Sequence, residues 1–345
     1  MKPHFTLSKK VIAKQHGRVA EVADTVSYSS KTNPLITPIL EKSTDCTFSI
    51  HLPNELKHVK DLRRVLFLAQ AWNGDLISEL LGKGISQFAV DNTSDLKILL
   101  DYLEQNKQVE LDRLFLRTKL KENTIRTEKY FVFGMNKDVV AKELKNLSTH
   151  PQIKSLGVHV HRKTQNIAEW NLIYEFSNMF DEETFSFIDV FNIGGGLPAD
   201  YANTNTKVIQ TIMKKLLELK QFLNEKETQL MIEPGRFIAA PAGTLRTEII
   251  SIYENNIVVN ASVYNSDMDA LIVPVKLIVE GEVEKHEGEP YVLKGITPCS
   301  MDLFRYRVYL KNASVGDELI FLNAGAYNFT TNFVDVDVLE TKVID

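Results

Sequence analysis

Eight short β-rich segments alternate with segments of helical periodicity between about residues 20 and 236. The β-rich segments are residues 25–31, 46–52, 64–70, 87–92, 113–120, 154–161, 187–195 and 229–236. Between them apolar residues recur every three to four positions, as in residues 93–107, 166–180 and 206–223. Strict alternation of strands and helices predicts a parallel sheet with right-handed crossovers, and eight repeats can close into a (β/α)8 barrel. A doubly wound open sheet is the alternative that this pattern leaves open.

The pattern changes after Arg236, where β-rich segments follow one another without long helices. These segments are residues 247–264, 270–284, 290–296, 304–312, 317–325 and 333–344. We therefore expect a barrel over residues 15–236 and an all-β domain over residues 237–345, to which residues 1–14 could also belong. Within the barrel, Asn54 and Thr93 are the residues we expect to cap two helices.

Composition and charge narrow the class of function. The 345 residues carry 40 Lys and Arg against 45 Asp and Glu, a net charge of −5, so no strong positive field attracts nucleic acid or anionic lipid. No window approaches 18 uninterrupted apolar residues, which predicts that no segment spans a membrane. Cys46 and Cys299 are too few for a disulfide framework and fit a reducing compartment. We expect a cytoplasmic protein with a small-molecule substrate.

Unusual residues follow several barrel strands at the ends where such barrels bind ligands. Lys31 ends the first predicted strand, His161 the sixth, residues 194–196 (GGG) follow the seventh, and residues 233–236 (EPGR) close the eighth. Three glycines let the backbone approach a phosphate and offer it N–H groups, and Arg236 could add a charged clamp. A mobile turn is the ordinary interpretation of GGG alone, and its place beside EPGR favours the phosphate.

Lys31 and Glu233 could take part in cofactor chemistry. A desolvated lysine near a phosphate and a carboxylate can form a Schiff base with a cofactor, although most lysines are solvated surface residues. Glu233 stands between apolar Ile232 and Pro234, where burial without a partner would be costly. His161 is also compatible with an ordinary core histidine.

Six motifs occur together in this chain. They are SYSSKTNP (27–34), GVHVHRKT (157–164), FNIGGGLP (191–198), IEPGRFIA (232–239), GITPCSMD (295–302) and NAGAYNF (323–329). In this order they resemble the pyridoxal-phosphate decarboxylases of the alanine-racemase fold, a group that includes ornithine, arginine and diaminopimelate decarboxylases. The similarity extends from about residue 20 to residue 335, and the combination is specific although each motif alone is not.

The resemblance implies a fold-type III enzyme with pyridoxal 5′-phosphate as its cofactor. Lys31 would form the internal aldimine, His161 would stack on the ring, and Glu233 would pair with the pyridinium nitrogen. Glu55 and Arg117 also fall on family positions near the cofactor. The residues implied to bind the cofactor, chiefly its phosphate, are Thr164, Gly194, Gly195, Gly196, Gly235, Arg236 and Tyr327. No metal ligand is implied.

The resemblance also implies a head-to-tail homodimer with shared active sites. Cys299 would come from the other subunit, face the substrate Cα and return a proton to the quinonoid intermediate. A small buried hydrophobe is the commoner role of a free cysteine.

The substrate end of the predicted pocket departs from the family. Val273 stands where ornithine decarboxylases carry an aspartate and diaminopimelate decarboxylases an arginine, and Ser300 follows the cysteine where the family has an acidic residue. A distal charge would lack its usual partner, which would be costly. Loop aspartates are often solvated or turn-forming. The candidate substrate contacts are Tyr264, Asp267, Asp269, Val273, Ser300 and Asp302.

The resemblance, taken with these departures, implies α-decarboxylation of an L-amino acid whose far end is not a simple charge. A modified or tethered side chain, as in antibiotic, siderophore or carrier-linked pathways, fits this interpretation. Three alternatives stay open: an amino-acid racemase of the same fold, an ornithine- or diaminopimelate-type decarboxylase with an altered pocket, and a non-catalytic cofactor-binding homologue.

Overall fold

A computed structural model describes residues 1–120, 133–161, 170–204 and 208–345. The chain divides into two compact units. The first consists of His16–Pro198 and Lys207–Gly235, and the second of Met1–Gln15, Ala199–Thr206 and Arg236–Asp345. Residues 199–204, which the sequence pattern assigned to the barrel, therefore belong with the second unit.

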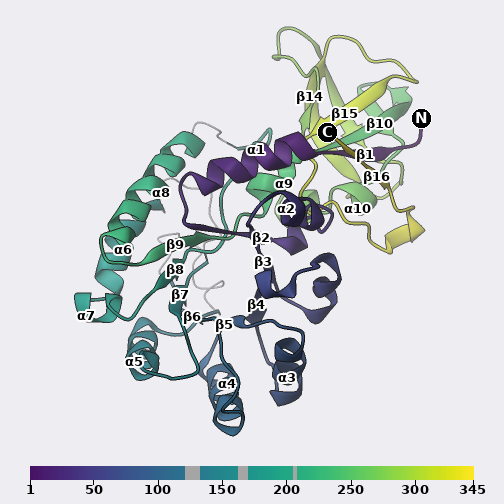
Figure 1. Cartoon of the computed structure of the whole chain (residues 1–345). Helices are drawn as coiled ribbons and strands as arrows, with labels where there is room; N and C mark the ends of the chain where they lie inside the picture. Colours follow the sequence, from purple (N-terminus) through teal and green to yellow (C-terminus); the bar gives the residue numbers. More distant parts are fainter. Residues whose placement is uncertain (121–132, 162–169, 205–207) are drawn as a thin grey trace. The chain divides into compact units, whose positions relative to one another are not determined.

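The first unit is built on a closed ring of eight parallel strands (Figure 1). The ring closes where β9 pairs with β2, with Thr25 opposite Met231 and Val26 opposite Ile232. This closure confirms the (β/α)8 barrel and excludes the open sheet. The strands are β2 (Thr25–Ser29), β3 (Thr47–Ile50), β4 (Val65–Ala69), β5 (Gln87–Val90), β6 (Arg113–Arg117), β7 (Leu156–His159), β8 (Val190–Asn192) and β9 (Gln229–Ile232).

Helices lie outside this ring (Figure 1). They are α2 (Thr37–Ser43), α3 (Gly74–Gly82), α4 (Thr93–Gln105), α5 (Lys137–Leu147), α6 (Leu172–Met179), α7 (Glu182–Phe185) and α8 (Val208–Asn224), with short 3-10 helices η1 (Ser30–Thr32), η2 (Pro53–His58) and η3 (Leu62–Arg64). The two expected caps were wrong. Asn92 caps α4 by accepting the N–H of Asp95, because the helix begins at Thr93 and its cap is the residue before it. Asn54 lies inside η2.

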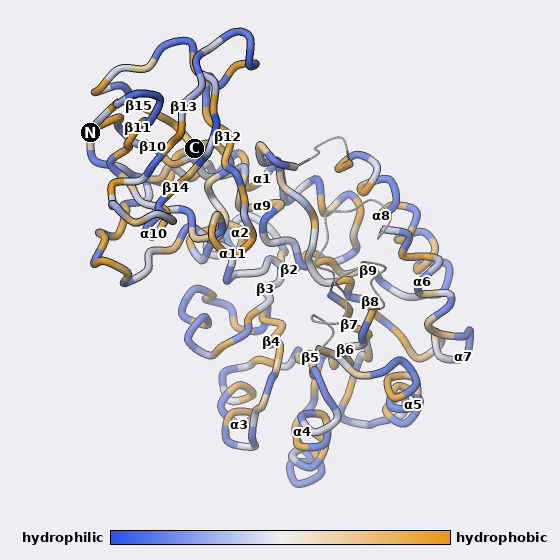
Figure 2. Tube along the Cα trace, turned by 180° about the vertical axis from the view of Figure 1, so that it is seen from behind, coloured by the Kyte–Doolittle hydropathy of each residue, from blue (hydrophilic) through white to orange (hydrophobic). Residues whose placement is uncertain are grey.

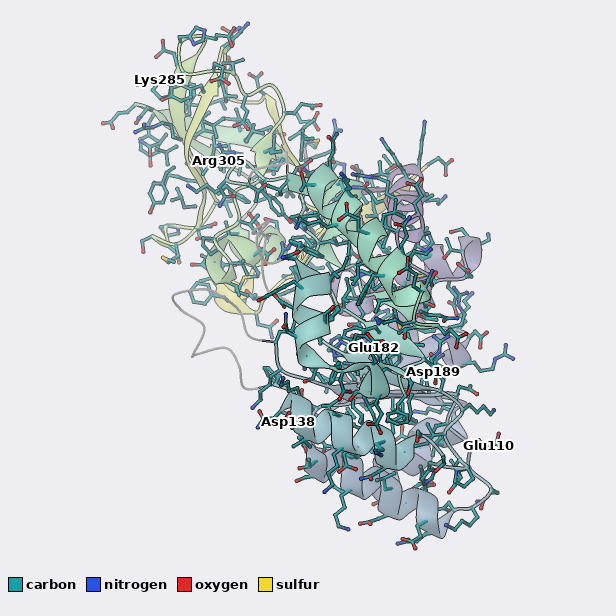
Figure 3. The ribbon with its side chains drawn as sticks, turned by 90° about the vertical axis from the view of Figure 1, so that its left-hand side faces the viewer. Glu110, Asp138, Glu182, Asp189, Lys285 and Arg305 are labelled. Atoms are coloured by element: carbon teal, nitrogen blue, oxygen red, sulfur yellow. The ribbon has the colours of Figure 1, made fainter. Side chains whose placement is uncertain are left out.

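Apolar side chains from separate strands fill the interior of the barrel. Leu66, Ala89, Phe115, Val190 and Met231, from five different strands, form one buried cluster, and the strands β4–β8 are largely coloured as hydrophobic in Figure 2. Before β8, the Asp189 carboxylate accepts the N–H of Leu156 at 2.7 Å and ties together the starts of two strands; Asp189 is labelled in Figure 3. The packed interior leaves ligand chemistry to the ends of the strands.

The second unit is a mixed β-sheet. Its main strand order is β12-β15-β10-β11-β13-β14, and β1 pairs with both β10 and β16. The elements are β1 (His4–Ser8), β10 (Gly243–Tyr253), β11 (Asn256–Val259), β12 (Ile278–Val279), β13 (Glu289–Lys294), β14 (Leu303–Leu310), β15 (Glu318–Leu322), β16 (Glu340–Ile344), α9 (Arg236–Ala242), α10 (Val263–Ser266), α11 (Asp269–Ile272) and η6 (Phe333–Asp335), while α1 (Lys9–Ala20) runs on from β1.

Two of the expected strands in this unit differ from the structure. Residues 270–284 contain only the two-residue strand β12, because their apolar run begins in the short helix α11. Residues 333–344 begin with η6 and become a strand only at Glu340. No helix within the described ranges is long and apolar enough to cross a membrane.

Candidate active site

Polar side chains gather at the carboxyl ends of the barrel strands. Lys31 lies in η1, directly after β2, and Glu55 lies in η2 after β3. Arg117 and His159 are the last residues of β6 and β7, and Glu233 follows β9. Since the carboxyl ends of parallel strands share one end of a barrel, these positions form a single rim.

Glu233 is a buried carboxylate held by two neighbours. Its side chain accepts a hydrogen bond from Asn192 Nδ2 at 2.9 Å, and its Oε2 lies 3.3 Å from His159 Nε2. Burial alone would raise the pKa of Glu233, but His159, Asn192 and His51 outweigh it and hold this pKa well below its usual range. The barrel mouth therefore contains a fixed negative charge.

The Lys31 amino group lies within the electrostatic reach of this carboxylate. Its side chain is exposed at the mouth of the barrel, yet the surrounding protein removes water from the amino group and lowers its pKa. The carboxylates of Glu233 and Glu55 act in the opposite direction, and Arg117 adds to the lowering. The net effect increases the fraction of Lys31 in the unprotonated, nucleophilic form.

His51 and Glu55 lie near the charges of Lys31 and Glu233. Glu55 Oε1 accepts the N–H groups of His51 and Leu52, at 3.0 and 2.9 Å. Burial, with Lys31 next in effect, lowers the pKa of His51 to about 4, so its imidazole is neutral at pH 7. Glu55 has a pKa raised by burial.

Arg117 is held by an ion pair with Asp91 rather than by Glu233 and the residues bonded to it. Its Nη1 lies 2.9 Å from Asp91 Oδ1, and the same oxygen accepts the N–H of Gly134 at 3.1 Å. Its guanidinium carbon also lies 5.0 Å from the centre of the Phe133 ring. Asp91 thus fixes the place of a second cation at the rim.

The triple-glycine turn requires glycine at its first position. Gly194 has φ +66°, and a Cβ there would lie 2.5 Å from the Val160 carbonyl oxygen. Its N–H donates to Asn192 Oδ1 at 2.9 Å, and the N–H of Gly195 donates to His161 Nδ1 at 3.3 Å. Two of the three N–H groups expected for a phosphate are therefore already bonded within the unit.

The implied phosphate contacts Arg236 and Tyr327 belong to the second unit. Arg236 Nη1 donates to Tyr201 Oη at 3.0 Å and to Asp269 Oδ2. Its guanidinium carbon lies 4.9 Å from the centre of the Tyr327 ring. Tyr327 has φ +54°, a conformation that an aromatic residue adopts only at a cost of about 1–3 kcal/mol and that is often found at functional sites.

Asp267 is a second carboxyl group in this part of the second unit. It is 4% exposed, and its Oδ2 has no hydrogen-bond partner among the described residues. Burial and the neighbouring Asp269 raise the pKa of Asp267 to about 7, against the attraction of Arg236 and a bond from the N–H of Ala270.

Tyr264, Cys299 and Asp302 lie together in the second unit. Burial raises the pKa of Tyr264, and Cys299 and Asp302 add to this electrostatically. Asp302 is 2% exposed and accepts hydrogen bonds from the N–H groups of Val263 and Thr297 and from the Thr297 hydroxyl. Both of its carboxylate oxygens are therefore engaged, which argues against a contact with a substrate amine.

The remaining predicted site residues are described by their exposure to solvent. Val273 is 46% exposed, and Ser300 is exposed. His161 is exposed, and its Nδ1 accepts the N–H of Gly195 in the glycine turn. Thr164 lies outside the described residues.

Sequence reasoning missed His51, Asp91, His159 and Asn192. His159 stands two residues before His161, and residues with this spacing face the same side of a strand. Asn192 stands two residues before the first glycine of the predicted turn. These positions were therefore visible in the motifs, although their partners were not.

Residues 9–240, more than half of the chain, match the model of the pyridoxal binding domain of the pyridoxal-dependent decarboxylases. The chain belongs to this decarboxylase family.

Curated members of the decarboxylase family are distant in sequence. The chain is similar to ornithine decarboxylase of Caenorhabditis elegans, with 23% identity over 289 residues, 76% of this chain and 66% of the relative. It is similar to 2-[(L-alanin-3-ylcarbamoyl)methyl]-2-hydroxybutanedioate decarboxylase of Staphylococcus aureus, with 23% identity over 227 residues, 59% of this chain and 56% of the relative. The matches thus span about two thirds or less of these relatives.

A solved decarboxylase structure agrees in fold over nearly the whole chain. The lysine/ornithine decarboxylase of Vibrio vulnificus, complexed with putrescine, gives a TM-score of 0.80 at 21% identity. The alignment covers 99% of this chain and 94% of that one. The barrel followed by a β domain is therefore the architecture of fold-type III decarboxylases.

The residues at the rim fit the pyridoxal cofactor for which the family is named. Four buried polar atoms there lack a hydrogen-bond partner among the described residues: Thr32 Oγ1, His51 Nδ1, Glu55 Oε2 and His159 Nδ1. Buried polar atoms are rarely left unpaired without a ligand or water. A fixed carboxylate and a lysine with a lowered pKa complete a set suited to a protonated aromatic ring with an aldehyde.

Proposed function

We propose that this protein binds pyridoxal 5′-phosphate and removes the α-carboxyl group of an L-amino acid as CO2. The single observation that carries the proposal is the buried Glu233 carboxylate, bonded to His159 and Asn192 and acting electrostatically on Lys31. When bound, the cofactor supplies an aldehyde that joins amines and a ring that takes up the electrons left by the lost carboxyl group.

Lys31 and Glu233 have complementary parts in this chemistry. The lowered pKa of Lys31 favours a free amine, which is the form that attacks an aldehyde. With the cofactor bound, the charge of Glu233 would favour a protonated ring nitrogen, because an opposite charge favours the cationic form. His159 and Asn192 keep Glu233 ionised despite its burial.

Other residues hold the ligand in place. His161, exposed beside the glycine turn, is the residue we assign to stack on the cofactor ring. Gly235 lets the backbone pack against Thr32, because a Cβ there would overlap Thr32 Oγ1. We assign the phosphate to the glycine turn, which belongs to the same unit as Lys31 and Glu233.

Cys299 is the residue we propose to return a proton to Cα. Its thiol is partly exposed, in contrast to the buried Cys46, so it can reach a substrate. The electrostatic effect of Cys299 on Tyr264 indicates that the two lie near each other.

The substrate we propose has a far end larger than a simple amine or carboxylate. Both carboxylate oxygens of Asp302 are already bonded within the protein. Val273, at the position where related decarboxylases carry a charge, and its neighbour Ile272 present exposed apolar surface. A modified or amide-tethered side chain fits this surface better than free ornithine, lysine or diaminopimelate. The compound after which the S. aureus relative is named is of this kind.

We further propose a head-to-tail homodimer. Support comes from exposed apolar side chains in the second unit, Met301, Phe329, Phe333 and Val334, each at least 49% exposed. Phe333 packs on Tyr264 with ring centres 4.5 Å apart, so this surface lies beside a proposed substrate contact.

CO2 release tests the reaction. The purified protein with cofactor is incubated in D2O with carboxyl-labelled ornithine, lysine, diaminopimelate and the compound of the S. aureus relative. We expect labelled CO2, fastest from the tethered substrate. Exchange of the Cα proton without CO2 would instead indicate a racemase, and neither signal with bound cofactor would overturn the proposal.

A mixing experiment tests the shared site. Lys31→Ala and Cys299→Ala each inactivate one half of a shared site, and random pairing of the two chains restores about one quarter of the sites. We expect activity to return on mixing. No recovery from an exchanging dimer would place both residues in the same subunit's site.

A further inference from the structure

The turn that carries Cys299 is closed by one buried carboxylate. Asp302 Oδ2 accepts the N–H of Thr297 at 3.0 Å and the Thr297 hydroxyl at 2.6 Å. The backbone N–H of Asp302 donates to the Cys299 carbonyl at 2.9 Å, and the Cys299 N–H donates to Thr297 Oγ1 at 3.4 Å. Both backbone polar groups of the cysteine are therefore bonded within this turn.

The same carboxylate reaches a second element. Asp302 Oδ1 accepts the N–H of Val263 at 2.9 Å, the first residue of α10, and the next residue is Tyr264. Ser262 caps this short helix independently, so Asp302 is not needed merely to start it. One side chain thus links the segment of the proposed proton donor to the segment of a proposed substrate contact.

The space around the carboxylate is restricted to this arrangement. Asp302 is 2% exposed, and a Cβ on Gly295 would overlap its carboxylate. The N–H of Gly295 donates to the Asp302 carbonyl at 2.9 Å, which fixes the far end of the turn as well. A buried carboxylate with three donors has a single well-defined orientation.

We propose that Asp302 is a positioning residue that fixes Cys299 relative to Tyr264. The inference rests on the proposed function, which gives Cys299 and Tyr264 their roles. The hydrogen bonds of Asp302 from which it is argued do not depend on that function. Asp302 touches neither substrate nor cofactor in this account. It acts through the turn, because its N–H holds the Cys299 carbonyl and its carboxylate holds the Thr297 hydroxyl that accepts the Cys299 N–H.

Thiol alkylation tests the proposal without cofactor turnover. The full-length protein is treated with iodoacetamide, and modification of Cys299 is followed by peptide mass spectrometry. Cys46, 1% exposed, serves as an internal measure of global unfolding. Asp302→Asn removes one acceptor oxygen, and Thr297→Val removes the hydroxyl that links Asp302 to the Cys299 N–H. Thr297→Ser is the matched control, since it keeps the hydroxyl.

We expect Cys299 to react at least about threefold faster in Asp302→Asn and in Thr297→Val, with Cys46 unreactive and Thr297→Ser like the parent. If Asp302→Asn fails to fold, Thr297→Val carries the test. Unchanged Cys299 reactivity in Thr297→Val, with or without a lower melting temperature, would overturn the positioning role and leave Asp302 a purely stabilising residue. Alkylation of Cys299 does not require CO2 release. A failure of the proposed function would therefore appear in the CO2 assay, and a failure of the positioning role in the alkylation assay.

Discussion

Asp267→Asn should flatten the dependence of stability on pH. The pKa of Asp267 is about 7 in the folded protein, against an ordinary value of 3.8. Between these values the folded state binds more protons than the unfolded state, so the free energy of unfolding falls as pH rises. At about 1.4 kcal/mol for each pKa unit, the loss between pH 4 and pH 8 is at most about 4 kcal/mol. An asparagine does not titrate and removes this loss.

The measurement is urea unfolding by circular dichroism from pH 5 to pH 8. The parent should lose stability across this range relative to Asp267→Asn, and the difference should level off above pH 8. The groups that act on Asp267, namely Asp269, Arg236 and Tyr201, are unchanged in the variant. Asp101→Asn, at an exposed position on α4, is the control and should run parallel to the parent. Parallel curves for Asp267→Asn would refute the reasoning.

Three further predictions test the site. Cys299→Ala should keep the cofactor absorbance while lowering the rate of amine formation by about 100-fold or more, as expected for loss of a general acid; loss of the absorbance would show that its role is misassigned. Gly235→Ala should lower the free energy of unfolding by about 1–3 kcal/mol, because its Cβ would overlap Thr32 Oγ1. Thr32→Ala in the same chain should restore part of that stability, and no rescue would contradict the steric cause. Glu233→Gln should reduce CO2 release by about 100-fold or more, since an amide cannot hold a proton on the ring nitrogen as a carboxylate does; unchanged turnover would exclude that role.

The barrel was predictable from the sequence because its signal repeats. All eight expected β-rich segments contain a barrel strand, and at least one described helix lies between each two consecutive barrel strands. Ring closure, however, depends on the pairing of Thr25 with Met231, which are more than 200 residues apart. The sequence around each residue does not indicate which strand it pairs with.

Short apolar runs were the least reliable signal. Residues 270–284 look like a strand, but periodicity cannot separate a strand from a helix over so few residues, and Asp269–Ile272 forms a helical turn. The N-terminal strand β1 could not be located from local sequence either, because its five residues are stabilised by pairing with β10 and β16 rather than by local propensity.

The candidate site was predictable in its residues and less so in its contacts. Lys31, His161 and Glu233 follow from motifs at strand ends, but the bonds from His159 and Asn192 that keep Glu233 ionised come from two other strands. Asp302 shows the same limit. Its sequence position suggested a substrate contact, whereas three donors from Val263 and Thr297 occupy it.

The most direct test of the account is to locate the covalent bond to the cofactor. The purified protein is incubated with pyridoxal 5′-phosphate, reduced with borohydride and mapped by peptide mass spectrometry. We predict a phosphopyridoxyl group on the Nζ of Lys31, and no such group in Lys31→Ala. A modification found on another lysine, or an unchanged yellow absorbance in Lys31→Ala, would contradict the central claim.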